Sequence, residues 1–270
     1  MREKALKIIL IFIGAAFIVI MLIMPLLTVI AYALRQGWNT FFNAISDPYA
    51  IKALKLTLFT TIISLVVNTV FGIFAAWAIT KFNFRAKQIL ITLIDIPFSI
   101  SPIIAGLIFI VVFGRIGWAY PLLEALNIKV VFAVPGIVLA TIFVTFPFVS
   151  RELIPLMNSS GSDEEEAAAL MGAKGFYIFR KITLPHIKWS LLYGMILCTA
   201  RALGEFGAVS VVSGHLRGKT NTLPLHVEIL YSEFNLTAAF SVASLLVIIA
   251  VIILILRNLI EYRLKRGEND

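Results

Sequence analysis

The chain has 270 residues, of which 60% are hydrophobic and only 14% are charged, and its mean hydropathy is +0.97. A soluble domain is about half apolar and about a quarter charged, so this composition excludes a soluble enzyme and indicates an integral membrane protein. The single cysteine, Cys198, excludes a disulfide framework, and the net charge of +8 comes from basic residues between apolar runs, a pattern typical of membrane proteins and not of nucleic-acid binding.

Long apolar segments recur along the chain. A helix needs about 20 apolar residues to cross a hydrocarbon core of about 30 Å. The third such segment contains Asp95 and two prolines, and the fifth carries Arg201 and Glu205. We therefore expect an all-α integral membrane protein with six transmembrane helices, over residues 8–34, 56–80, 88–113, 130–150, 191–213 and 236–256.

The distribution of basic residues predicts the orientation. With six spans both termini lie on one side, and 15 of the 23 lysines and arginines fall on that side against seven on the other. Because basic residues are enriched in cytoplasmic loops, we expect both termini in the cytoplasm. The first span resembles a signal peptide, but it is about twice as long as a secretory apolar region of ~7–15 residues, so we expect a retained anchor.

One cytoplasmic loop, residues 151–190, is about 40 residues long, too small for a catalytic domain and too long for a simple turn. Ser162 and Glu165 have the spacing of a capping box, which predicts a helix start. Acidic residues follow in the first turn, where the helix dipole favours negative charge. Gly172 is placed to end this helix in a left-handed conformation.

A second short helix is expected over residues 176–181, with Leu184-Pro185 stopping it and redirecting the chain into the fifth span. The two helices would form a knob that is acidic at one end, basic at the other and apolar on one face. Such a knob could rest on lipid headgroups or bind a protein. Its four acidic residues would be repelled by an anionic leaflet, which favours a protein partner.

The knob carries a recognisable motif. Glu166-Ala167-Ala168, then Gly172, then Ile182-Thr-Leu184-Pro185 resembles the EAA loop of the membrane subunits of binding-protein-dependent ABC importers. The resemblance implies the type I importer permease (MetI-like) fold, with residues 1–270 as one transmembrane domain. It also implies that residues 151–190 hold a coupling helix seated on a cytoplasmic ATPase, which would involve Glu166, Ala167, Ala168, Gly172, Ile182, Leu184 and Pro185.

Three other segments, residues 93–106, 143–153 and 200–214, resemble the permease subunits of sulfate/thiosulfate importers, particularly the W-type. The T-type and molybdate permeases share the Arg-Ala-Leu-Gly-Glu-Phe-Gly core and differ after Ala208. The resemblance implies a multi-pass protein of the inner membrane. Its partners would be a second permease of the T-type, two copies of an ATPase that holds ATP and magnesium, and an extracytoplasmic sulfate-binding protein. Thiosulfate, molybdate and tungstate stay open as substrates.

Catalytic and metal-binding patterns are missing from the sequence. No Gly-x-x-x-x-Gly-Lys-[Ser/Thr] stretch occurs, so we expect no ATP site and no cofactor in this chain. His186, His215 and His226 are scattered and have no metal-ligand spacing, and no catalytic triad is evident. A secondary transporter driven by an ion gradient is the alternative, but it predicts an internal repeat that the two halves do not show.

Charges within the apolar segments need partners, because an ionised side chain at mid-bilayer costs ~2.5–3.5 kcal/mol. Arg201 and Glu205 are four residues apart on one expected helix and can pair. We expect Asp95 to add a second carboxylate near Arg201. This group could fasten helices together or present Arg201 to an anion, and because two carboxylates would neutralise Arg201 we favour a structural or gating role.

The segment from Asp95 to Pro102 is the candidate pathway. Pro97 and Pro102 interrupt the helical hydrogen bonds, and Ser99 and Ser101 supply hydroxyl groups. Irregular backbone at membrane depth is tolerated only where protein or water covers it, and transporters often place sites there. A packed proline kink is the alternative.

Small residues at a spacing of four predict close helix packing in two places. One set is Asn68, Gly72 and Ala76, and the other is Ala200, Gly204 and Ala208.

Overall fold

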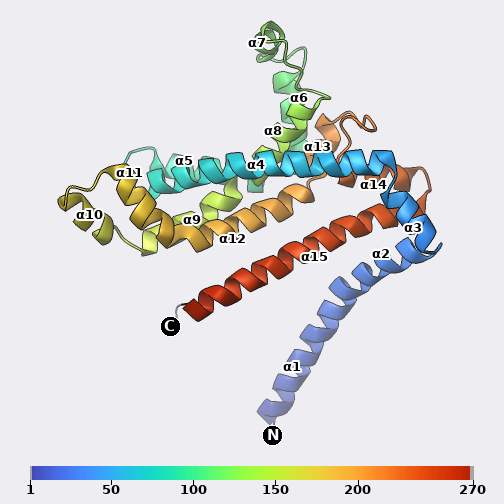
Figure 1. Ribbon diagram of the computed structural model, residues 1–270, viewed down its shortest axis with the longest axis horizontal. Helices are drawn as coiled ribbons and strands as arrows, with labels where there is room; N and C mark the ends of the chain where they lie inside the picture. Colours follow the sequence, from blue (N-terminus) through green and yellow to red (C-terminus); the bar gives the residue numbers. More distant parts are fainter. Residues whose placement is uncertain (1, 268–270) are drawn as a thin grey trace.

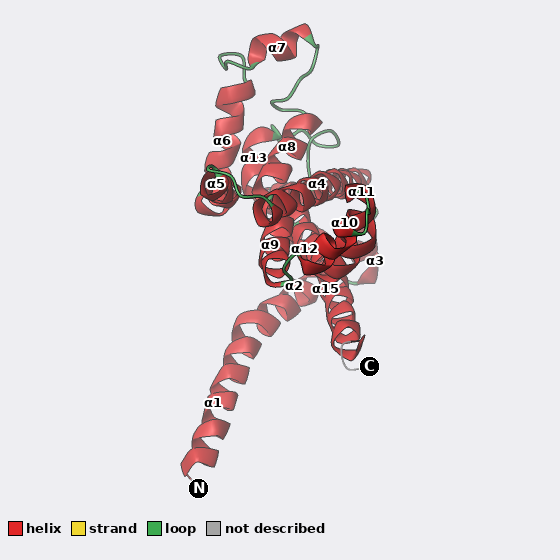
Figure 2. Cartoon of the chain, turned by 90° about the vertical axis from the view of Figure 1, so that its left-hand side faces the viewer, coloured by secondary structure: helices red, strands yellow, loops and turns green. Residues whose placement is uncertain are grey.

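The computed structural model describes residues 2–267, and all the regular structure among them is helical (Figures 1 and 2). Met1 and residues 268–270, the ends that we expect in the cytoplasm, lie outside the described residues. The elements are α1 (Arg2–Ile18), the π-helix η1 (Val19–Ile23), α2 (Met24–Leu34), α3 (Trp38–Ile45), α4 (Pro48–Lys81), α5 (Lys87–Ser99), α6 (Pro102–Phe113), α7 (Tyr120–Ala125), α8 (Val134–Thr145), α9 (Pro147–Ser159), α10 (Asp163–Leu170), α11 (Gly175–Ile178), the π-helix η2 (Phe179–Thr183), α12 (Leu184–Leu203), α13 (Gly207–Val212), α14 (Leu223–Ser232) and α15 (Leu236–Gly267).

The membrane-spanning helices follow the expected order with altered bounds. Among the described residues, four helical segments are long and apolar enough to cross a membrane, and a bent pair of helices makes a fifth. The four are Leu6–Leu34, Pro48–Lys81, Val134–Ser159 and Leu236–Leu259. The span expected over residues 191–213 is not among them, and no single helix covers that range, since α12 ends at Leu203 and the short α13 begins at Gly207. An all-α membrane protein is therefore confirmed, but the count of six spans is not.

The third span is broken. Helices α5 and α6 meet at an angle of 108°, so the predicted interruption of the segment over residues 88–113 is confirmed and the alternative of a simple proline kink is wrong. The backbone of Ile100 and Ser101 is extended at the break, as expected for a residue before proline. Pro102 occupies the first turn of α6, where its missing N–H needs no partner. The break therefore lies between the two prolines.

The fourth span runs nine residues further than expected. Helices α8 and α9 join through Phe146 and end at Ser159, so residues 151–159 are helix and not loop. At the other end residues 130–132 lie outside the helix. Pro147 does not stop the helix because it stands in the first turn of α9. The loop on this side of the membrane is shorter than predicted as a result.

Helix α4 lies at the centre of the bundle and is tied to α8 and α12 by one amide. The Nδ2 of Asn68 donates to Thr145 Oγ1 at 2.8 Å and to the carbonyl of Ile142 at 3.2 Å, and it lies 3.9 Å from Cys198 Sγ. Gly72 and Ala76 follow on the same face and are buried against α9. The small-residue face predicted on α4 is confirmed.

The second predicted small-residue face is wrong as a single face. Ala200 and Gly204 are exposed, while Ala208 is buried against α6. The helix ends at Leu203, so Ala208 belongs to a different helix from Ala200. Residues four apart share a face only within one continuous helix, so the spacing predicts nothing across the end of α12.

The first span stands apart from the bundle. Figures 1 and 2 show α1 pointing away from the other helices, and none of the residues in the most apolar stretch of this span is buried. Helix α2 returns to pack along α15. At another corner of the molecule, α7 lies at the tip of an arm that continues from α6. The core is formed by α4, α8, α9, α12 and α13, and a second buried cluster joins α4 to α14 and α15.

We predict that Gly72→Leu destabilises the bundle. An added Cβ alone would lie 2.7 Å from Val149 Cγ1 and 3.1 Å from the backbone nitrogen of Ser150, so α4 and α9 must separate. Overpacking of this kind costs about 1–3 kcal/mol, and the thermal midpoint of the detergent-solubilised protein should fall. Gly14→Leu is the control, because nothing lies within 4 Å of a Cβ there. Equal midpoints for the two variants would contradict the packing.

Candidate functional site

The knob predicted from the sequence is present at one end of the molecule. Helix α10 projects from the end of the bundle with α11 beside it (Figure 1). Its first turn holds Asp163, Glu164, Glu165 and Glu166, as expected. Ala168 is buried against the rest of the chain, whereas Leu170 and Met171 are 90% and 82% exposed. The acidic first turn faces the bundle in part, and the apolar end does not.

The predicted capping box is wrong. Ser162 is the N-cap of α10 but makes no side-chain cap, and its Oγ donates instead to Glu166 Oε1 at 2.5 Å. Glu165 does not reach back to the helix start because its carboxylate has charged and hydroxyl partners elsewhere. The carboxylate is ionised in either arrangement, but the ammonium group adds the attraction of opposite charges to the hydrogen bond, which a neutral backbone amide does not.

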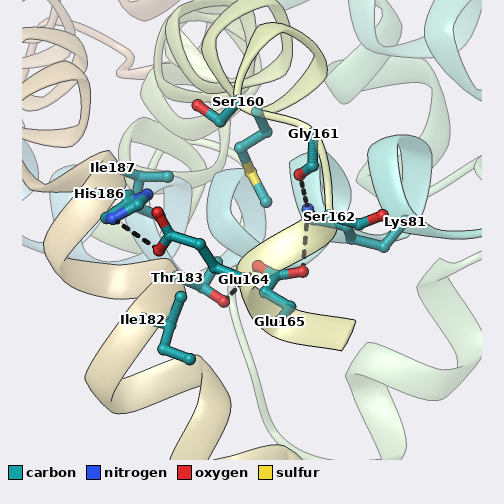
Figure 3. Close-up of a pocket in the computed structure, with 11 residues that line it drawn as sticks. Lys81, Ser160, Gly161, Ser162, Glu164, Glu165, Ile182, Thr183, His186 and Ile187 are labelled. Atoms are coloured by element: carbon teal, nitrogen blue, oxygen red, sulfur yellow. Dashed lines mark hydrogen bonds and ion pairs between the residues drawn. The ribbon is translucent and has the colours of Figure 1, made fainter. Parts of the chain in front are cut away.

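Glu165 joins three segments of the chain (Figure 3). Its Oε2 lies 2.9 Å from Lys81 Nζ, at the end of α4, and its Oε1 accepts a hydrogen bond of 2.6 Å from Thr183 Oγ1, just before α12. Lys81 also donates to the carbonyl of Gly161 at 2.6 Å. The side chains of Lys81 and Glu165 are only 14% and 19% exposed. We call Lys81, Gly161, Glu165 and Thr183 the Glu165 clamp.

A second contact runs beside the Glu165 clamp. His186 Nε2 lies 3.2 Å from Glu164 Oε2, and both residues line the same small cavity (Figure 3). The sequence analysis did not single out Lys81 or Thr183. Lys81 precedes Glu165 by more than 80 residues, and no local pattern connects the two.

Gly172 ends α10 as predicted. Its φ is +85°, its N–H bonds to the carbonyl of Ala169 at 2.9 Å, and Ala173 N–H bonds to the carbonyl of Ala168 at 3.0 Å. These two bonds are the Schellman pattern, which satisfies carbonyls at a helix end and favours glycine at the left-handed residue. The sharp turn brings the chain directly to Gly175 and α11.

The second helix of the knob does not stop at Pro185, and that prediction is wrong. Helix α11, the π-helix η2 and α12 follow one another without a gap from Gly175 to Leu203. Pro185 lies in the first turn of α12, next to a π turn whose longer hydrogen bonds accommodate a residue that cannot donate. The second helix of the knob is therefore the beginning of the continuous helical run that includes α12, and not a separate short helix.

The residues predicted to contact an ATPase divide into two groups. Glu166, Ala167, Gly172 and Pro185 are exposed, while Ala168 is buried and Ile182 and Leu184 are half-buried. Beside the exposed group lies the apolar patch of the knob, as predicted: Leu170, Met171, Phe176 and Tyr177. Contiguous exposed apolar side chains of this kind mark protein interfaces.

The predicted pair of Arg201 and Glu205 is confirmed, with a different setting. Arg201 Nη1 lies 2.6 Å from Glu205 Oε2, and the Glu205 side chain is 1% exposed. The pair bridges a helix end, because α12 stops at Leu203. Glu205 Oε1 also accepts the backbone N–H of Ala208 at 2.8 Å and so caps α13. One carboxylate thus holds the end of α12 and the start of α13.

Asp95 does not join that pair, so the predicted second carboxylate beside Arg201 is wrong. Asp95 Oδ1 lies 3.1 Å from Nε of Arg151, on α9. The long extension of α9 explains the difference, since it places Arg151 on a helix beside α5 and not in the loop. At the break that follows, Ser99 and Ser101 are exposed and Pro97 is buried.

The histidines lie apart. His186 pairs with Glu164, and His215 Nδ1 lies 3.7 Å from Glu228 Oε2. His226 is buried on α14, and burial lowers the pKa of its imidazole despite the opposing charge of Asp47. No group of three or more histidine, cysteine, aspartate or glutamate side chains that could hold a metal ion is found between residues 2 and 267.

Comparisons with known proteins agree on one family. The model of the family described as "Binding-protein-dependent transport system inner membrane component" matches residues 68–266. The chain is 48% identical over 264 residues to the sulfate transport system permease protein CysW of Synechococcus elongatus, covering 98% of this chain and 92% of that protein. The CysW protein of Escherichia coli K12 is 45% identical over 256 residues, covering 95% and 88%.

The fold also has a match among solved structures. A chain in the crystal structure of a bacterial alginate ABC transporter, in complex with an alginate pentasaccharide-bound periplasmic protein, superposes with a TM-score of 0.81. The match covers 97% of this chain and 96% of that chain, at 17% sequence identity. At this identity the likeness concerns the fold alone.

We predict that Lys81→Met loosens α10. The Glu165 carboxylate would lose its ammonium partner, and charge-assisted bonds in a partly exposed setting contribute about 1–2 kcal/mol. Backbone amides of α10 should then exchange with deuterium about tenfold faster. Lys87→Met removes an equal charge at the start of α5 and serves as control. Unchanged exchange in Lys81→Met would show that the Glu165 clamp does not hold α10.

We also predict that Gly172→Val opens the turn after α10 while Gly172→Asn preserves it. Valine is strained at a φ of +85°, by about 1–2 kcal/mol, whereas asparagine tolerates the left-handed region. Tryptic cleavage after Lys174, two residues further on, should accelerate about 5- to 30-fold in the valine variant. Equal cleavage of the two variants would argue against the cap.

Proposed function

Because this chain belongs to the family of binding-protein-dependent transport system inner membrane components, we propose that it is a permease subunit of an ATP-driven sulfate import complex. The family match and the near-full-length similarity to CysW proteins support this proposal. The observation that carries it is the knob: an acidic, capped helix with an exposed apolar tip, fixed to two membrane helices.

The first step of coupling takes place at the knob. An ATPase would dock on the patch of Leu170, Met171, Phe176 and Tyr177, with Glu166 beside it. ATP and magnesium would be held by that ATPase. Because the Glu165 clamp fixes α10 to α4 and Thr183, a push on α10 moves the knob as one body. A flexible loop in the same place would change its own conformation and would not transmit the displacement.

The second step carries the displacement into the membrane. The helical run from Gly175 to Leu203 connects the knob to the middle of the bundle without a break. Its far end is tied by Glu205 to α13, and α13 lies against α6, where an added Cβ on Gly207 would lie 2.9 Å from Pro102 Cβ. Displacement of α12 therefore reaches the bend between α5 and α6. Helix breaks of this kind are where rigid segments reorient.

The complete complex would contain a second, T-type permease, two ATPase copies and an extracytoplasmic sulfate-binding protein. Both termini and the knob would lie in the cytoplasm, as the distribution of basic residues predicts. The binding protein would supply most of the substrate selectivity. This chain would then form half of the pathway, with Asp95, Pro97, Ser99, Ser101, Arg201 and Glu205 as its pathway or gating residues.

We predict that the complex reconstituted in liposomes takes up radiolabelled sulfate only when ATP, magnesium and loaded binding protein are present. Removing the ATPase should abolish uptake, because this chain has no nucleotide-binding loop. An excess of unlabelled sulfate should compete and molybdate should compete poorly. Uptake driven by an ion gradient without ATP would contradict the proposal, and preference for molybdate would reassign the substrate.

A further inference from the structure

The pair of Asp95 and Arg151 lies at membrane depth and yet is open to its surroundings. Asp95 is eight residues from the start of α5, and Arg151 is eight residues from the end of α9. At about 1.5 Å per residue both lie about 12 Å in from those ends, and both belong to segments that are long and apolar enough to cross a membrane. Their side chains are nevertheless 38% and 56% exposed.

Exposure of this kind indicates a face that does not meet lipid. An ionised side chain facing hydrocarbon costs about 2.5–3.5 kcal/mol, and Asp95 is too short to reach the membrane surface. Ser99 lies on the same face of α5, four residues on, and is exposed as well. Helix α4 is different, since between residues 58 and 74 its exposed side chains are all apolar, among them Phe59, Ile62, Val66, Val70 and Phe74.

The Arg151 guanidinium keeps donors free. Its five N–H donors share one acidic partner: Nε lies 3.1 Å from Asp95 Oδ1, and no second ion pair of Arg151 is found between residues 2 and 267. The group lies 4.8 Å from the centre of the Phe98 ring, which holds it in place by a cation–π contact. Phe98 in turn packs edge-on against Phe148 at 5.2 Å. The cation is thus positioned with more donors than one carboxylate can use.

Arg201 is less able to bind an anion than Arg151. Its partner Glu205 is buried and is also engaged by the N–H of Ala208, so the pair is locked at the junction of α12 and α13. Asp95 is a looser partner, half exposed and held through one guanidinium nitrogen. A doubly charged oxyanion accepts parallel bonds from an arginine fork and competes better than one carboxylate.

We propose that Arg151 is the side chain that contacts the translocated dianion, a tetrahedral oxyanion such as sulfate, and that Asp95 is its counterion between passages. The inference rests on the proposed function and adds a contact that neither the EAA motif nor the Arg201 segment supplies. The Nη groups of Arg151 and the hydroxyl of Ser99 donate to the anion as it passes the bend between α5 and α6. Return of Asp95 to Arg151 releases the anion, so the site stays weak, as a pathway requires.

Thiol labelling tests which face is wet while Asp95 and Arg151 stay in place. Ser99→Cys should react with a membrane-impermeant anionic methanethiosulfonate in the assembled complex, and sulfate should slow the reaction at least about threefold. Val66→Cys, on the apolar face of α4, is the matched control and should not react. Native Cys198 is buried and sets the background. A silent Ser99→Cys, or equal labelling of Val66→Cys, would overturn the proposal.

Transport variants test the role of the cation. Arg151→Met should lower sulfate uptake at least about tenfold while ATP hydrolysis stimulated by loaded binding protein stays within about twofold of wild type, and Arg151→Lys should be intermediate. Asp95→Asn keeps the cation and removes only its counterion, so sulfate protection of Ser99→Cys should persist in this background, whereas Arg151→Met should abolish the protection. Arg85→Met, an exposed charge before α5, is the control.

Equal loss of sulfate protection in Asp95→Asn and Arg151→Met would mean that the pair only ties α5 to α9, and would overturn the proposal. Failure of the proposed function looks different, because the wild-type complex itself would then show no ATP-dependent uptake. Sulfate protection of Ser99→Cys can still be measured in that case.

Discussion

The ion pair between Lys81 and Glu165 is the contact on which the coupling end of the molecule depends. Helix α10 has eight residues, and an isolated helix of that length is not stable in water. It persists because Glu165 is held from two sides and because Gly172 closes its last turn. The exposed apolar tip can then be presented in one orientation, although little of the tip itself is packed.

A second constraint comes from backbone groups at membrane depth, which need partners wherever a helix breaks. Two breaks occur, between α5 and α6 and between α12 and α13, and they lie against each other. The side-chain oxygen of Glu205 satisfies the N–H of Ala208, and the lack of a side chain at Gly106 lets α6 approach the Ala208 carbonyl. Helix α6, which follows the first break, packs against α13, which follows the second. The two breaks are therefore expected to move together.

The features that the sequence predicted correctly are those that depend on neighbours within one turn or on one helix face. The left-handed end at Gly172, the pair of Arg201 and Glu205 and the small-residue face of Asn68 and Gly72 are of this kind. The all-α membrane class followed from composition, and the family followed from the spacing of the EAA motif.

The predictions that failed depended on partners far away in the sequence. Glu165 pairs with Lys81 and does not form the predicted capping box. Asp95 pairs with Arg151 because α9 is longer than the apolar pattern indicates. Pro185 does not end a helix because a π turn precedes it, which no local rule predicts.

The character of the molecular surface follows from these long-range contacts. Apolar residues cover the exposed side of α4 between residues 58 and 74 and most of the first span, whereas Asp95, Ser99 and Arg151 form a polar face within two other spanning segments. Lipid can cover the first kind of surface but not the second, so the polar face needs water or another polypeptide opposite it, and this chain by itself encloses only part of a pathway.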